Sequence, residues 1–191
     1  MEVKDAMKKC FEMQSDFWKT VFNSNPKFPY IEEFNNDELF IKDTMDKEGY
    51  AEWKPKEQLL SIDEDLIANK LGIQLHPELK EFYSSYCFLQ LTGKMSDETI
   101  IEFDRISFGC DINQHIIENH IDKKQVKEYC SDLAEFDLFE LGCATVDEND
   151  GYLVCFDNTR GKVLLVYFAE QLVRDLDMTL YDLFNSFTAV Y

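Results

Sequence analysis

Basic residues are scarce in this chain of 191 residues, which has 19 Lys and Arg against 38 Asp and Glu and a formal net charge of -19 at pH 7. Between Glu128 and Thr159 there is no Lys or Arg at all. Such a surface repels nucleic acids and anionic lipid headgroups, and it attracts basic macromolecules. Acidity also serves solubility alone, but a surface shaped only by solubility usually mixes charges of both signs. We therefore expect a positively charged protein as partner and no direct binding of nucleic acid.

Long apolar runs are missing too. The longest, Val163 to Ala169, is far too short to cross a bilayer, and no apolar signal-peptide core follows the charged residues Met1 to Lys9. The six cysteines are scattered without a C-x-x-C pair, which predicts reduced and mostly buried thiols. We expect a cytoplasmic protein that associates with membranes at most peripherally, at the inner face and through a protein partner.

Motifs for catalysis and metal binding are absent from the sequence. There is no G-x-S-x-G, G-x-x-x-x-G-K-[ST] or G-x-G-x-x-G, so nucleophile elbows and phosphate-binding loops lack their local geometry. His115 and His120 are five residues apart and do not share a helix face as a zinc pair would. Cys110 precedes the predicted helix that carries His115, an arrangement that could activate a thiol, but a single Cys beside Asp111 is more often a buried packing residue. We expect no catalytic residues, no metal, no cofactor and no enzymatic activity.

The sequence does contain clear helix and strand patterns. Apolar residues at three- and four-residue spacing predict a helix from Val3 to Phe22, with an aromatic stripe that belongs to the core. Residues 30–58 are polar and irregular, which predicts a long surface excursion anchored by Trp53. Further helices are predicted at 61–71 with a capping box from Ser61, at 78–86, at 111–129 with Asp111 as N-cap, at 169–177, and at 179–187 with a capping box from Thr179.

Strand patterns fill the second half of the chain. They predict strands at 87–92, 99–108, 138–146, 152–156 and 162–168, with a tight turn at 158–161. This order of elements predicts a single domain over residues 1–191. Its expected class is α+β, a mainly antiparallel sheet with helices from both chain ends packed against it.

Two groups of acidic residues in the stretch without cations are candidates for the partner-binding surface. They are Asp132, Glu135, Asp137 and Glu140, which recur within nine residues before the third predicted strand, and Asp147, Glu148 and Asp150 at the turn that follows it. Carboxylates that meet a basic partner speed its association and set its register. The alternative is that these side chains are simply solvated.

A series of short landmarks, in this order along the chain, resembles the Syd family of the SUKH superfamily. The first are Phe17-Trp18, Phe28-Pro29, Glu32-Glu33, Trp53-Lys54-Pro55, His76-Pro77 and Phe82-Tyr83-Ser84. The later ones are 117–121 with Lys123-Lys124, 144–148, the hairpin 154–163, and Leu172, Val173, Leu176, Leu180 and Phe184 near the end.

The resemblance implies a SUKH-type α+β fold that binds other proteins without catalysis. Syd-type proteins dock on basic cytosolic loops of the SecY translocon, and many members of the superfamily are immunity proteins that neutralise a toxin delivered by another cell. Both roles fit a negative surface. We favour an immunity protein that neutralises a basic, nuclease-type antibacterial toxin, because carboxylates can match the cationic groove of such a toxin. Docking on SecY is the alternative.

Overall fold

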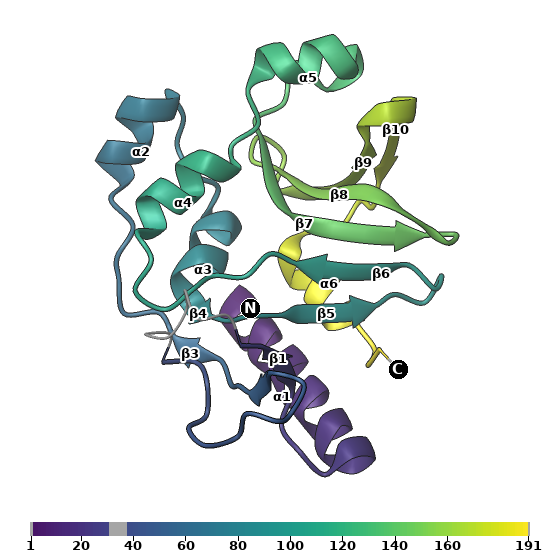
Figure 1. Ribbon diagram of the computed structural model, residues 1–191. Coiled ribbons are helices and arrows are strands. Elements are labelled where there is room, and N and C mark those ends of the chain that lie inside the picture. The colour runs from purple at the N-terminus through teal and green to yellow at the C-terminus, as the bar shows by residue number, and fades with distance from the viewer. Residues whose placement is uncertain (1, 31–37, 191) are drawn as a thin grey trace.

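A six-stranded antiparallel sheet forms the centre of the molecule in the computed structural model, which describes residues 2–30 and 38–190 (Figure 1). Its strands are β5 (Leu91–Lys94), β6 (Ile100–Phe103), β7 (Leu138–Val146), β8 (Asn149–Asp157), β9 (Lys162–Tyr167) and β10 (Leu172–Asp175). Each strand pairs with its neighbours in sequence, so that β5 and β10 are the two edges. The chain between β6 and β7 leaves the sheet and returns to it.

Helices and two small sheets complete the described residues. The helices are α1 (Val3–Phe22), α2 (Glu64–Leu71), α3 (Pro77–Ser85), α4 (Ile112–Asn119), α5 (Lys123–Tyr129) and α6 (Leu180–Ser186), with short 3-10 turns η2 (Ser131–Leu133) and η3 (Phe168–Glu170). The small sheets pair β1 (Lys27–Pro29) with β2 (Tyr50–Glu52), and β3 (Lys56–Glu57) with β4 (Tyr86–Cys87). In this part of the chain no helix has both the length and the apolar character needed to span a bilayer.

The two faces of the sheet are covered unequally. Alternate side chains such as Phe139, Val154 and Leu165 point to the main core, which α1, α3 and α6 complete. On the other face, α5 and η2 cover β8, β9 and the first residue of β7, where Val126 and Leu133 pack with Leu138 in a smaller core. In Figure 1, α6 passes behind β5 and β6, and no helix drawn lies in front of them. We call this side of β5, β6 and the part of β7 after Leu138 the open face.

The predicted α+β class, with helices at both chain ends, is confirmed. The capping predictions also hold at two helices, because Asp111 accepts hydrogen bonds from the N–H groups of Asn113 and Gln114, and Thr179 forms a capping box with Asp182. The turn at 158–161 joins β8 to β9 as predicted. These features depend on residues close together in the sequence, which is why local patterns reveal them.

The predicted helix at 169–177 is wrong. Residues Leu172–Asp175 form β10, which pairs antiparallel with β9, and Gln171 adopts a left-handed conformation (φ 56°) that ends the preceding 3-10 turn. The apolar residues of this segment fit helical spacing as well as they fit a strand. Pairing with the free edge of β9 favours the strand over the helix. Local sequence patterns carry no information about that edge because β9 is a separate segment of the chain.

Two other helix predictions need correction. The helix expected at 111–129 is divided, because His120 is extended and the N–H of Ile121 donates to the carbonyl of Leu138 at 2.9 Å. Asp122 then caps α5 through the N–H of Lys124. At α2 the N-cap is Asp63, not Ser61, and Asp63 accepts a hydrogen bond from the N–H of Leu66.

The segment 30–58 is more ordered than its composition suggests, although residues 31–37 lie outside the described part of the chain. Strands β2 and β3 were not predicted, and they tie the segment to β1 and β4. Trp53 is 1% exposed, and its backbone N–H donates to the carbonyl of Pro26 at 2.9 Å. Trp53 therefore anchors this region from within the core.

Candidate protein-binding surface

The acidic residues singled out from the sequence do not form one surface. Glu135 and Asp137 lie just before β7, whereas Asp147 and Glu148 form the two-residue loop after it. A nine-residue strand separates its ends by about 25 Å. Asp132 lies in η2 and Asp150 in β8, but their side chains are outside the described structure.

Folding brings cations to the first of these ends. Lys123 Nζ lies 2.8 Å from Asp137 Oδ1, and Arg160 pairs with the fully buried Asp157 and, at 2.8 Å, with Asp175. The sequence between Glu128 and Thr159 lacks cations, but the residues on either side of it supply them. This end of β7 is therefore less negative than the sequence suggests, although Glu135 remains exposed.

The loop between β7 and β8 presents two adjacent carboxylates to solvent. Asp147 and Glu148 are exposed, and both have left-handed backbone angles, with φ of 48° and 67°. Val146 pairs directly with Asn149, so the hairpin closes with only these two residues. Such turns favour Asn-Gly, and side chains other than Gly are strained there.

Glu140 belongs to a different group, which we call the acidic cluster: Glu102, Asp104 and Glu140. Register places Glu102 opposite Cys143, and the N–H of Asp104 donates to the carbonyl of Leu141 at 2.9 Å. Asp104 therefore lies beside Glu140 across the β6–β7 pair. Because side chains alternate along a strand, all three carboxylates project from the open face.

Electrostatics in the acidic cluster are unfavourable when no cation is bound. Burial raises the pKa of Glu140, and the nearby charge of Asp104 raises it further. The Asp104 side chain keeps contact with solvent, yet the surrounding protein removes enough water to raise its pKa as well, an effect that His115 and Arg105 oppose. Like charges on adjacent strands repel each other. A bound cation would relieve this cost.

Uncharged polar side chains border the acidic cluster on the side of α4. Asn119 Nδ2 donates to Tyr83 Oη at 3.3 Å and lies 3.4 Å from His115 Nε2. Burial is the main cause that lowers the pKa of His115 and raises the pKa of Tyr83. Both groups therefore favour their neutral forms, and the carboxylates set the sign of the local charge.

The chemistry of this region is suited to binding cations. Cys110, considered above with His115, is half-buried and packs against the main core. Among the described residues no group of three His, Cys, Asp or Glu side chains is arranged to hold a metal ion. What the open face offers is a set of partly desolvated carboxylates, which guanidinium and ammonium groups match.

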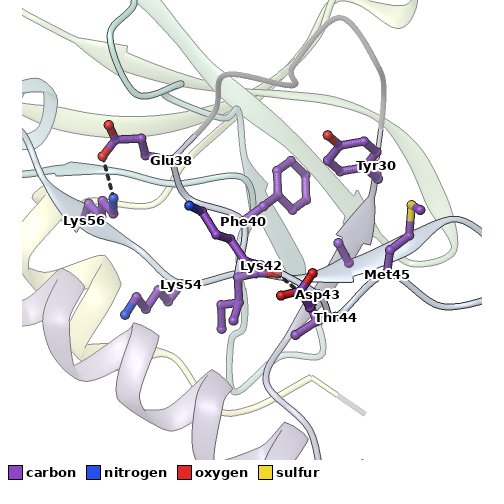
Figure 2. Close-up of a pocket in the computed structure, with 11 residues that line it drawn as sticks. Tyr30, Glu38, Phe40, Lys42, Asp43, Thr44, Met45, Lys54 and Lys56 are labelled. Atoms are coloured by element: carbon purple, nitrogen blue, oxygen red, sulfur yellow. Dashed lines mark hydrogen bonds and ion pairs between the residues drawn. The ribbon is translucent and has the colours of Figure 1, made fainter.

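A separate cavity of about 1130 Å³ lies beside β2 and the start of β3, and Figure 2 shows the side chains that line it. Its cationic lining includes Lys42, Lys54 and Lys56. Lys56 Nζ pairs with Glu38 Oε2 at 2.8 Å, and a dashed line between these two residues marks the contact in Figure 2. Lys42 and Lys54 are exposed. A cavity with these ammonium groups is a poor match for a basic partner.

Sequence reasoning found Glu140 but missed Glu102 and Asp104. These two lie outside the stretch without cations, next to Arg105, so the charge pattern gives no reason to select them. The alternation of Ile101 and Phe103 with Glu102 and Asp104 was the available signal, because it marks a strand with one polar face. No protein-family model matches the chain, and no curated protein matches it significantly.

Proposed function

We propose that the chain is a non-enzymatic binding protein whose open face receives the cationic side chains of a basic protein. The observation that carries this proposal is the acidic cluster, in which neighbouring carboxylates with raised pKa values lie on an uncovered sheet face. A partner that places guanidinium groups there replaces repulsion with charge-assisted hydrogen bonds. The net charge of -19 accelerates the encounter at low salt.

The biological role that we propose is immunity, in which the chain binds and neutralises a basic, nuclease-type antibacterial toxin. An enzyme that cuts nucleic acid needs a cationic groove, and the acidic cluster offers carboxylates in place of phosphates. The resemblance to the Syd family supports a protein-binding role. Docking on basic cytosolic loops of SecY uses the same charges and is the alternative.

A matched pair of variants tests the role of the open face. The cluster variant carries Glu102→Gln and Asp104→Asn, and the hairpin variant carries Asp147→Asn and Glu148→Gln, so each removes two negative charges. An immunity protein is encoded beside its toxin, so the probe is the C-terminal toxin domain of a secreted protein encoded next to this chain. Growth is scored when that domain is expressed alone and with each form of the chain.

We expect the native chain and the hairpin variant to restore growth and the cluster variant to fail. Failure of the native chain to protect against the neighbouring toxin would contradict the immunity role. Tight, salt-dependent binding of the native chain to SecY cytosolic-loop peptides would then favour the alternative. If the cluster variant protects as well as the native chain, the contact lies elsewhere on the surface.

A further inference from the structure

Helix α1 buries its apolar stripe along only half of its length. Val3, Met7 and Phe11 in the first half are at most 6% exposed and belong to the main core. The stripe continues as Phe17, Trp18, Val21 and Phe22, but Val21 is 55% exposed and Phe22 is 56% exposed. The sequence predicts core for the whole stripe, but Val21 and Phe22 leave more than half of their side-chain surface in contact with solvent.

Phe17, Trp18 and Phe22 of this stripe form one wall of a groove at the β5 edge of the sheet. The groove has a volume of about 240 Å³, and its lining includes Phe17, Trp18 and Phe22 on one side and Gln90 and Thr92 on the other. The rings of Trp18 and Phe22 are 4.7 Å apart, which holds the aromatic wall together. The Thr92 hydroxyl is buried without a hydrogen-bond partner. This volume is suited to one or two apolar side chains.

The groove is continuous with the acidic cluster. Thr92 pairs with Glu102 in the β5–β6 register, and Gln90 Nε2 donates to Glu102 Oε1 at 3.5 Å. Neighbouring strands are about 4.8 Å apart, so Glu140 on β7 lies about 10 Å from β5. A single element of a partner can therefore occupy the groove and reach the carboxylates.

We propose that the groove binds an apolar anchor of the same basic partner, most simply a helix that crosses β5, β6 and β7. This inference rests on the proposed function and adds the kind of surface that the partner presents. One helical turn rises about 5.4 Å, close to the strand spacing, so cations one and two turns after the anchor lie above β6 and β7, the strands that carry the acidic cluster. Exposed aromatic groups beside charges are typical of binding hot spots. Self-association through the groove is disfavoured because each copy has a net charge of -19.

Two short helical peptides test the proposal. The leucine peptide has leucines in its first turn and arginines in the next two turns, and the alanine peptide replaces the leucines by alanine. Binding is measured by calorimetry at low salt. Acrylamide quenching of tryptophan fluorescence reports on the groove, because Trp18 lines it while Trp53, the other of the two tryptophans, is 1% exposed.

We expect the alanine peptide to bind in a salt-dependent manner and the leucine peptide to bind on the order of tenfold more tightly. The leucine peptide should also protect Trp18 from acrylamide. Phe22→Ala should remove most of the difference in affinity between the two peptides by weakening the leucine peptide, without changing the affinity of the alanine peptide. Leu59→Ala, a truncation at a side chain that is 78% exposed elsewhere on the surface, should change neither affinity.

Equal affinities of the two peptides for the native chain would overturn the proposal that the groove binds an apolar anchor. The proposed role of the acidic cluster would be unaffected. A second contrary result is that the leucine peptide still binds more tightly to the Phe22→Ala variant, and a third is that it binds without changing the quenching of Trp18. Either of these would place the anchor elsewhere and overturn the groove proposal. If neither peptide binds, the proposed function and this inference both fail. A dimer of the native chain that protects Trp18 would assign the groove to a second copy and overturn the proposal.

Discussion

At the scale of a single residue, Glu140 shows the electrostatic cost of the carboxylates on the open face. Its pKa is raised above the ordinary value of 4.5 by burial and by Asp104. An acid whose pKa is higher in the folded than in the unfolded chain destabilises the fold once it is ionised. The penalty is complete at neutral pH and disappears as the pH falls below the unfolded pKa.

Glu140→Gln should therefore stabilise the free protein at neutral pH, by a few tenths to about 1 kcal/mol, the range of cross-strand pair energies. Urea unfolding measures this gain, and repeating it at about pH 4, where an unperturbed Glu is largely protonated, should show the gain shrinking. Glu135→Gln, at an exposed position outside the cluster, is the control. Loss of stability at neutral pH in the Glu140 variant would mean that the carboxylate is satisfied rather than repelled.

His120 has the opposite dependence on pH. Its Nε2 is buried without a hydrogen-bond partner. Burial lowers the pKa of the ring below 6.5. The charge of Lys123 lowers this pKa further, whereas the charges of Asp137 and Asp122 oppose the shift. The unfolded chain then binds the proton more readily, so acidification through this range destabilises the fold. His120→Phe, which preserves the packing on Phe139, should reduce the stability lost between neutral pH and about pH 5. An unchanged pH profile in chemical denaturation would show that His120 does not contribute.

At the scale of secondary-structure elements, the β7–β8 hairpin is strained by its sequence. Both loop residues have positive φ, so Glu148→Gly should relieve strain and stabilise the fold by up to about 1 kcal/mol. Glu148→Gln is the matched control because it removes the charge and keeps the strain. A thermal shift that is the same in both variants would attribute the effect to charge.

The β8–β9 hairpin depends on one arginine. Arg160 pairs with the fully buried Asp157, reaches Asp175 on β10, and stacks over the ring of Phe136 at 4.4 Å. Arg160→Ala leaves the Asp157 carboxylate buried without its cation, and we expect a loss of about 2–3 kcal/mol in the free energy of unfolding. The double variant Arg160→Ala with Asp157→Asn should recover part of this loss. If it recovers none, packing on Phe136 dominates.

How much of the fold the sequence predicts depends on the range of the interactions involved. Periodicity identifies α1, and capping chemistry locates the starts of α4 and α6, because these signals span a few residues. The strand β10 needs the edge of β9, and the break before α5 needs Leu138. The acidic cluster likewise depends on pairing between β6 and β7, about 40 residues apart in sequence, so charge runs along the chain reveal only Glu140.

At the scale of the whole molecule, we distinguish acids that would attract a basic partner over a distance from acids that would contact it directly. The loop acids Asp147 and Glu148 are exposed at the far end of β7, where they add to the long-range field. Removing them should slow association with a basic partner at low salt by about twofold to threefold. Stopped-flow association rates check this, and the effect should fade at physiological ionic strength because charges more than about 8 Å apart are then screened.

The most direct test of the central claim compares the affinities of the native chain, the cluster variant and the hairpin variant for the alanine peptide, at low and at physiological salt. If the open face receives cations, the cluster variant binds about tenfold more weakly at low salt and stays weaker at physiological salt, because contacting charges are screened less. The hairpin variant should approach the native chain at physiological salt. Equal losses of affinity in the two variants at both salt concentrations would contradict a specific cation-binding face and leave only a diffuse negative surface.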